Sequence, residues 1–207
     1  MIKLVLWDWN GTILDDVYQS MEAVNRMLDR KNMPRIDIDK YYSLVDTPIE
    51  RFYHKLFGTT DIDFAEIAHE FHNDYDEQIP TLSLNDGANE MLEYFESIGA
   101  KQAVISSAHV DMIEKVIDNF DVRKYFDVIL ASRDKEAGSK IERAKKYFEN
   151  VRKSPDETIF IGDTLHDFET AKALGVKCIL TTQGHQTRRE FKSIDALIVD
   201  NLEEINL

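Results

Sequence analysis

The stretch Met1-Ile2-Lys3-Leu4-Val5-Leu6-Trp7-Asp8-Trp9-Asn10-Gly11-Thr12-Ile13-Leu14 decides the fold. Its apolar residues favour strands and stop at Asp8, which predicts a strand buried on both faces, as in a parallel sheet. A carboxylate just past such a strand is placed where open α/β sheets bind ligands. Asn10-Gly11 is also the commonest two-residue hairpin signal, so this stretch alone leaves open an antiparallel hairpin with Asp8 in its turn.

The composition narrows the class of protein. The chain has 207 residues, of which 43% are hydrophobic, and a net charge of −14. Its length fits one domain, or a core with a small insertion, and its charge argues against nucleic acid or an anionic membrane as a partner. The single cysteine, Cys178, excludes an internal disulfide and fits a reducing compartment. Because no apolar stretch approaches the ~20 residues that span a bilayer, we expect a cytoplasmic protein.

Residues 15–82 are predicted to be helical and differ from the rest of the chain. Apolar residues recur at helical spacing in three stretches, which begin near Val17, Ile49 and Phe64. Thr47-Pro48 predicts a helix N-cap with proline at the first helical position. We expect a small helical bundle, inserted after the first strand and packed over the carboxyl edge of the sheet.

The second half of the sequence alternates strands with helices. We expect strands at residues 102–105, 126–130, 158–161, 177–180 and 196–199, and helices at residues 87–97, 110–119, 140–150 and 168–174. Strict alternation predicts an α/β fold, a parallel Rossmann-like sheet with helices on both faces. This pattern argues against the hairpin at Asn10-Gly11, because the chain turns helical there instead of returning as a partner strand.

Polar residues follow the predicted strands at the points where the strands end. Ser106 and Ser107 follow one strand, Gly162 to Asp167 follow another, and Lys140 opens a helix between them. Taken singly, the serines, Asp163 and Thr164 are explained as helix caps. Lys140 is explained as a solvated side chain, although a cation in the first turn of a helix opposes the helix dipole.

Together these residues predict a chemistry that caps alone do not. The carboxyl ends of parallel strands meet at one edge, so Asp8, Asp163 and Asp167 are expected to converge there. Clustered carboxylates suit Mg²⁺, and a carboxylate can form an aspartyl-phosphate. A lysine and a serine hydroxyl can hold the oxygens of a transferring phosphoryl group. The set predicts phosphoryl transfer with Mg²⁺ as cofactor.

The motifs resemble those of the haloacid dehalogenase superfamily. The segment Asp8 to Thr12, with Leu14-Asp15 behind it, is similar to the signature D-x-D-G-T, and Ser106, Lys140 and Gly162-Asp163-Thr164-x-x-Asp167 match the second, third and fourth motifs. Phosphoglycolate phosphatase-like proteins are the nearest resemblance. It implies a discontinuous α/β catalytic core, residues 1–14 and 83–207, and a helical cap domain, residues 15–82.

The resemblance also implies a role for each matching residue. Asp8 would be the nucleophile, and Mg²⁺ would be held by Asp8, the carbonyl of Asn10 and Asp163, with Asp167 as a further or outer ligand. The phosphate-binding candidates are Thr12, Ser106, Ser107 and Lys140, and the candidate substrate or cap residues are Asp15, Asp46, Thr47 and His109. Lys135 is a second candidate for the third motif, since Lys140 lacks the proline that often follows the family's lysine.

Asn10 is the important departure from the family pattern. In the family's phosphatases an aspartate here protonates the leaving alcohol and activates water, which an asparagine cannot do; such help contributes ~10²- to 10⁴-fold. We expect a phosphatase for a small phosphorylated metabolite that is slow on alkyl phosphates, unless His166 or Asp15 substitutes as a base. The alternative is a non-catalytic or regulatory phospho-acceptor. Dehalogenase chemistry, which needs no metal, and phosphomutase chemistry rank lower.

Two further expectations concern a loop and the assembly. The loop from Gln183 to Arg189 is expected to be mainly solvated, although it could touch substrate from the rim of the site. A cap of this size usually closes a site without a partner, so a monomer is favoured.

Overall fold

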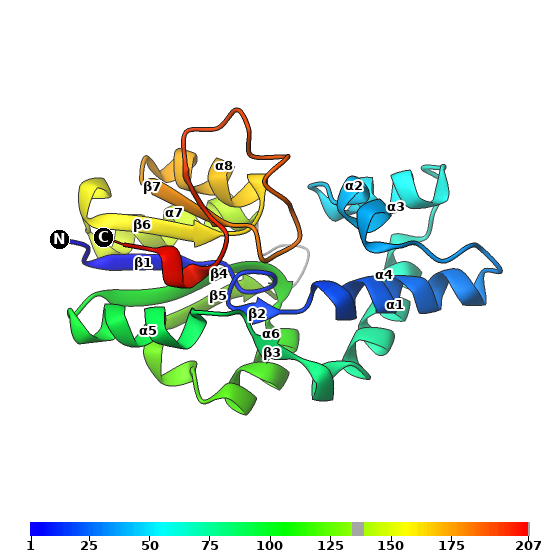
Figure 1. Cartoon of the computed structure of the whole chain (residues 1–207), viewed down its shortest axis with the longest axis horizontal. Coiled ribbons are helices and arrows are strands. Elements are labelled where there is room, and N and C mark those ends of the chain that lie inside the picture. Colours follow the sequence, from blue (N-terminus) through cyan, green and yellow to red (C-terminus); the bar gives the residue numbers. More distant parts are fainter. Residues whose placement is uncertain (134–138, 207) are drawn as a thin grey trace. The chain divides into compact units, whose positions relative to one another are not determined.

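The chain divides into two compact units. The computed structural model describes residues 1–133 and 139–206. One unit comprises Met1–Asp15 and Ser83–Leu207, called here the core unit, and the other is Asp16–Leu82, called here the helical unit (Figure 1).

A six-stranded parallel sheet forms the centre of the core unit. Its strands are β1 (Leu4–Trp7), β4 (Lys101–His109), β5 (Val128–Ser132), β6 (Thr158–Gly162), β7 (Lys177–Thr181) and β8 (Leu197–Val199). They lie in the order β5-β4-β1-β6-β7-β8, and every neighbouring pair is parallel. This confirms the predicted Rossmann-like α/β sheet. Because β1 lies between β4 and β6, the residues that follow these three strands are brought to one stretch of the sheet edge.

Helices cover both faces of this sheet. They are α5 (Ala88–Ser97), α6 (Val110–Ile117), α7 (Lys140–Val151) and α8 (Leu165–Leu174). Helices α7 and α8 pack against one face, where Ala144 and Ala171 join a buried cluster with Leu4 and Leu6 of β1. Helix α5 covers the other face, as Figure 1 shows, and its Phe95 contacts Trp7 edge to face with ring centroids 5.9 Å apart. All four residues of β1 are buried, as the apolar run predicted.

A second, two-stranded ladder joins the ends of the core segments. Strand β2 (Leu14–Asp15) pairs antiparallel with β3 (Ser83–Leu84), which places Leu14 opposite Leu84. The chain after Gly11 therefore does not return along β1 as a hairpin. Short 3-10 helices complete this unit at Asp118–Phe120, Arg123–Tyr125, Pro155–Glu157 and Leu202–Glu204.

The helical unit contains four α-helices around its own apolar centre. They are α1 (Val17–Arg30), α2 (Ile38–Leu44), α3 (Ile49–Phe57) and α4 (Phe64–Asp76), followed by a 3-10 helix at Ile79–Thr81. The sequence did not predict α2. The expected N-cap at Thr47 was wrong: Pro48, with an extended ψ of 163°, is the N-cap of α3, and no side chain caps this helix. In the part of the chain that the structure describes, no helix is long and apolar enough to cross a membrane.

Candidate active site

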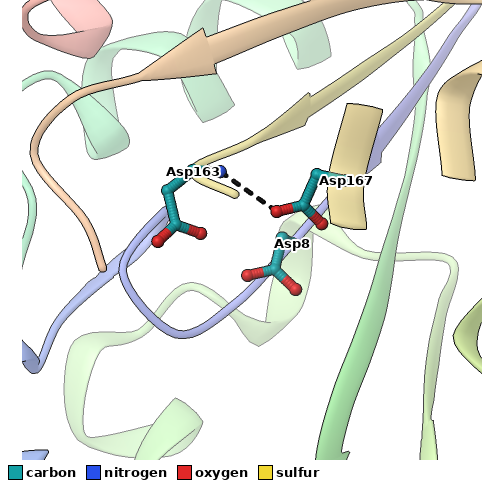
Figure 2. A group of neighbouring side chains, drawn as sticks. All are labelled: Asp8, Asp163 and Asp167. Atoms are coloured by element: carbon teal, nitrogen blue, oxygen red, sulfur yellow. Dashed lines mark hydrogen bonds between the residues drawn. The ribbon is translucent and has the colours of Figure 1, made fainter. Parts of the chain in front are cut away.

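Three carboxylates meet at the carboxyl edge of the sheet. Asp8 directly follows β1, Asp163 directly follows β6, and Asp167 lies in the first turn of α8. All three are buried, and one oxygen of each lies within 4.8 Å of the others (Figure 2). The pairing of β1 with β6 brings them together, although Asp8 and Asp163 are far apart in the sequence.

The first turn of α8 fixes the Asp167 carboxylate. Thr164 and Asp167 form a capping box, in which the Asp167 carboxylate accepts a hydrogen bond from the Thr164 backbone N–H at 2.9 Å. The same Oδ2 accepts from the backbone N–H of Asp163 at 3.2 Å, the contact drawn in Figure 2. This cap starts α8 at Leu165, three residues before the predicted start at Phe168. Asp167 is therefore both a helix cap and a member of the acidic cluster.

Lys140 supplies positive charge to the cluster. A capping box between Ser139 and Glu142 starts α7 and makes Lys140 its first residue. Lys140 is 4% exposed, so it is not a solvated side chain; its ammonium donates to Asp8 and, at 2.5 Å, to Oδ1 of Asp167. The alternative for the third motif, Lys135, lies outside the described residues.

Burial and mutual repulsion govern the pKa values in this cluster. Burial, reinforced by the charges of Asp167 and Asp163, raises the pKa of Asp8 well above its usual range despite the attraction of Lys140. Burial likewise raises the pKa of Asp163 to about 6. Burial also acts to raise the pKa of Asp167, but Lys140 and Thr164 outweigh it and hold that pKa below its ordinary value. In Lys140, burial lowers the ammonium pKa, but Asp167 and Asp8 outweigh it and raise that pKa.

The cluster fits a divalent cation. When all three carboxylates are ionised they carry three negative charges, and the Lys140 ammonium pairs with two of them, Asp8 and Asp167. The donors are oxygen atoms, which Mg²⁺ prefers. A bound cation would offset the repulsion that raises the pKa of Asp8 and Asp163. Asp8, Asp163 and Asp167 are therefore the side chains that could hold it.

Asp163 is held by two donors from distant parts of the chain. Its Oδ1 accepts from the Thr12 hydroxyl at 2.9 Å, and its Oδ2 accepts from the His185 backbone N–H at 2.7 Å. Glycines make this approach possible: a Cβ would lie 2.1 Å from Asp163 Oδ2 at Gly184 and 2.3 Å from it at Gly11. The loop after β7 was expected to be mainly solvated, but at Gly184 and His185 it packs against the cluster. The contact runs through the backbone, so Gly184 was the only sequence signal for it.

Ser106 and Ser107 were predicted to follow a strand but lie inside β4 (Lys101–His109), where its pairing with β5 shifts register between Ile105 and His109. Ser106 adds a hydroxyl group there. Ser106 is 2% exposed, and its Oγ accepts from the Ala108 backbone N–H at 3.1 Å, which leaves the hydroxyl proton for another acceptor. Ser107 is exposed. Sequence reasoning missed Arg143, whose Nη2 donates to the Ser106 carbonyl at 2.8 Å from one turn beyond Lys140 on α7. Its position three residues after Lys140 was the available signal.

The remaining candidates occupy separate places. In the core unit, Asn10 forms an isolated bridge with Leu14, and the Asp15 carboxylate accepts from the Ser83 hydroxyl at 3.5 Å. His109 caps α6, and its Nε2 lies 2.7 Å from the Arg133 carbonyl oxygen. His166 Nδ1 lies 3.5 Å from Glu169 Oε2. In the helical unit, Asp46 pairs with Lys55 at 2.8 Å and accepts from the Thr47 backbone N–H.

Comparison with known proteins agrees with this fold and site. Residues 5–181 match the haloacid dehalogenase-like hydrolase family, so the chain belongs to that family. This confirms the resemblance drawn from the motifs around Asp8 and Asp163.

Individual relatives cover nearly the whole chain. A phosphoglycolate phosphatase of Pseudomonas fluorescens is 26% identical over 211 residues, which cover 97% of this chain and 77% of that protein. The tyrosine-protein kinase PtkA of Mycobacterium tuberculosis is 24% identical over 185 residues, 88% of this chain and 63% of its own length. The crystal structure of a predicted phosphatase from Clostridium acetobutylicum matches with a TM-score of 0.83 at 22% identity and covers 99% of this chain and 96% of its own.

Proposed function

We propose that this protein is a phosphatase that hydrolyses a small phosphorylated metabolite through an aspartyl-phosphate on Asp8. The observation that carries the proposal is the buried cluster of Asp8, Asp163 and Asp167 with Lys140, at the carboxyl edge of the sheet. The likeness to a phosphoglycolate phosphatase supports a phosphoric monoester as the substrate class. The helical unit is proposed as the cap domain, with Asp46 and Thr47 as its candidate functional residues.

The chemistry proceeds in two displacements. An Asp8 carboxylate oxygen attacks phosphorus, the bond from phosphorus to the leaving oxygen breaks, an aspartyl-phosphate forms, and the departing alkoxide takes its proton from solvent water. Water then attacks the same phosphorus, the bond to Asp8 breaks, and inorganic phosphate leaves. The Ser106 hydroxyl, whose oxygen accepts from Ala108, would donate a hydrogen bond to a phosphoryl oxygen, and Lys140 would offset the charge on Asp8 and the phosphoryl group.

Mg²⁺ is the proposed cofactor of this site. It would be held by Asp8, Asp163 and the Asn10 carbonyl, and it would neutralise charge on the phosphoryl oxygens. Both oxygens of Asp167 already accept hydrogen bonds, from Lys140 on one side and from Thr164 and Asp163 on the other. Both oxygens of Asp163 are likewise hydrogen-bonded, so the proposal of Asp167 as a further or outer ligand rests on the family pattern.

Asn10 limits which leaving groups depart easily. An asparagine side chain transfers no proton, so alkyl phosphates lose general acid catalysis, typically ~10²- to 10⁴-fold. Aryl and acyl phosphates, whose leaving groups need no proton, are affected less. We expect Asn10→Asp to raise turnover on an alkyl phosphate more than on an aryl phosphate. If both rates stay unchanged, Asn10 does not limit the reaction.

The deciding experiment is steady-state hydrolysis of p-nitrophenyl phosphate with and without Mg²⁺. The native protein should turn over only with the metal, and Asp8→Asn should remove this turnover while the protein stays folded. Turnover that survives in Asp8→Asn would exclude the aspartyl-phosphate mechanism. Screening of phosphorylated metabolites would then identify the substrate.

A second function is favoured by Asn10 alone. Without a group at residue 10 to activate water, the aspartyl-phosphate on Asp8 would be long-lived, and the protein would act as a phospho-acceptor or regulator. The likeness to a tyrosine-protein kinase shows that at least one relative carries a name other than phosphatase, which is compatible with this second function. A burst of one nitrophenolate per protein molecule, followed by little turnover, supports this second function; continuous turnover from the first cycle supports the phosphatase.

A further inference from the structure

Asn85 belongs to the second segment of the core unit, which begins at Ser83. It contacts the nucleophile loop, defined here as residues 8–12. It lies between β3 and α5 and is 7% exposed. Its side-chain Nδ2 donates to the carbonyl oxygens of Gly11 at 2.8 Å and Thr12 at 2.9 Å. Its backbone N–H donates to the Ile13 carbonyl at 2.9 Å. One residue thus holds three successive carbonyls of the chain that follows Asp8.

The side chain at residue 85 has to be an amide to make these contacts. An amide nitrogen carries two protons, and Asn85 uses them on two different carbonyls. A serine offers one proton, and an ionised aspartate offers none and would repel both carbonyl oxygens. Because the two carbonyls are buried, loss of either hydrogen bond leaves an acceptor without water to replace it.

Gly11 is held from two sides. It has a left-handed backbone with φ of 73°, and a Cβ at this position would lie 2.3 Å from Asp163 Oδ2. The loop therefore already lies against one carboxylate of the acidic cluster, while Asn85 holds the carbonyl of the same residue. A small shift of Gly11 would move Asn10 and Asp8, its neighbours in the loop, relative to Asp163.

We propose that Asn85 is a positioning residue for the cation site. It fixes the Gly11 and Thr12 carbonyls in hydrogen bonds, so that the loop presents the Asp8 carboxylate and the Asn10 carbonyl to the same cation as Asp163. This inference rests on the proposed function, because the cation is the Mg²⁺ of that mechanism. It adds that Asn85, three residues after the helical unit ends at Leu82, shapes the cation site.

Asn25 provides a matched control for a purely structural role. It is 4% exposed in the helical unit, and its side chain donates to the Ile36 carbonyl at 3.0 Å and accepts from the Ile36 backbone N–H at 2.8 Å. Asn25 and Asn85 therefore match in burial and in the number of side-chain hydrogen bonds to backbone. Only Asn85 touches the loop that carries Asp8.

The test is an Mg²⁺ titration followed by tryptophan fluorescence, a signal that does not depend on turnover. The signal comes from Trp9, in the nucleophile loop, and from Trp7, the last residue of β1, which are 1% and 0% exposed. Asn85→Ser should raise the half-saturating Mg²⁺ concentration about 10-fold or more, as loss of outer-shell partners of a metal site does. Asn85→Gln, which keeps the amide one methylene further out, should give an intermediate value, and Asn25→Ser should match the native protein.

The outcomes separate this inference from the proposed function. Thermal melts first establish that each variant is folded; if Asn85→Ser is not, Asn85→Gln decides by the same criterion. Native-like Mg²⁺ affinity in the folded Asn85 variants overturns the inference and leaves the proposed function intact. An equal loss of affinity in Asn25→Ser also overturns it, because the effect would then be general destabilisation. If the native protein gives no response to Mg²⁺, the metal-dependent function fails and the inference fails with it.

Discussion

The two units of this protein bury carboxylates in different ways. In the helical unit, Asp16 is 1% exposed and accepts from the Tyr75 hydroxyl at 2.9 Å and the Ser20 hydroxyl at 3.2 Å. Asp74 of the same unit pairs with Arg30 at 2.5 Å. In the core unit, three carboxylates are buried together, and the ammonium of Lys140 pairs with two of them, Asp8 and Asp167.

This difference distinguishes structural from functional charge. A hydrogen-bond donor or counter-ion of its own offsets the free-energy cost of burying a carboxylate, as Arg30 does for Asp74. In the core cluster one ammonium, that of Lys140, is shared by two carboxylates, and Asp8 and Asp163 have raised pKa values. Such perturbed groups are typical of sites that bind a cation or react.

The largest loss of stability is expected from removing the cationic side chain that pairs with buried carboxylates in each unit, Lys140 in the core unit and Arg30 in the helical unit. Lys140→Met leaves Asp8 and Asp167 buried without a counter-ion and should cost about 3–5 kcal/mol in the free energy of unfolding. Arg30→Met removes the partner of Asp74, but the Arg30 side chain is 46% exposed, so we expect about 1 kcal/mol or less. Urea unfolding at pH 7.5 without divalent cations measures both. Equal costs would contradict the distinction between the two units.

A smaller effect is expected from an added methyl group in each unit. Gly184→Ala would place Cβ 2.1 Å from Asp163 Oδ2, so it should cost about 1–3 kcal/mol and weaken Mg²⁺ binding. Gly58→Ala in the helical unit meets no atom within 4 Å, and its left-handed φ of 68° should cost about 1 kcal/mol. Unfolding and Mg²⁺ titrations check both variants. Weakened Mg²⁺ binding in Gly58→Ala would show that the titration reports stability alone.

The smallest effect concerns pH. The pKa of Asp163 is about 6 in the folded protein, above the ~3.9 of an unfolded aspartate. The folded state therefore binds more protons between these values, and the stability that Asp163 contributes falls as the pH rises through 6. Mg²⁺ requires the ionised carboxylate, so the rise in Tm with Mg²⁺ should be larger at pH 7.5 than at pH 5.

Two aspartate variants sharpen this comparison. Asp163→Asn should reduce both the Mg²⁺-induced rise in Tm and its dependence on pH, because it removes one of the two carboxylates with raised pKa values and one proposed ligand. Asp74→Asn, in the helical unit, should leave that dependence as it is in the native protein. A flat native profile would contradict the role given to Asp163.

Sequence reasoning placed residues correctly where they lie at the end of a predicted element. Asp8 and Asp163 follow buried strands, and alternation of strands with helices was enough to predict that these strands are parallel and end at one edge. Lys140 was recognised because a cation in the first turn of a helix opposes the helix dipole. The structure brings these three residues into one cluster.

Sequence reasoning failed where a contact is made by a backbone N–H group or by a single polar residue in a connection between two elements. His185 reaches Asp163 through its backbone N–H, which any residue type offers, and Asn85 lies in a short connection without periodicity. The start of α8 was placed too late because Thr164 and Asp167 were considered as site or cap residues singly, whereas they form one capping box. No local pattern records partners that are far apart in the chain.

The β2–β3 ladder sets the junctions of the helical unit next to each other, since Asp15 pairs with Ser83. For the core, everything between these residues is a loop whose ends are already joined. Loop-closure entropy grows only with the logarithm of length, about 0.6 kcal/mol per doubling. The intervening segment can therefore lengthen, shorten or be replaced at little cost to the core. The helical unit can therefore be replaced by a different segment in the course of evolution while the residues at the sheet edge stay the same.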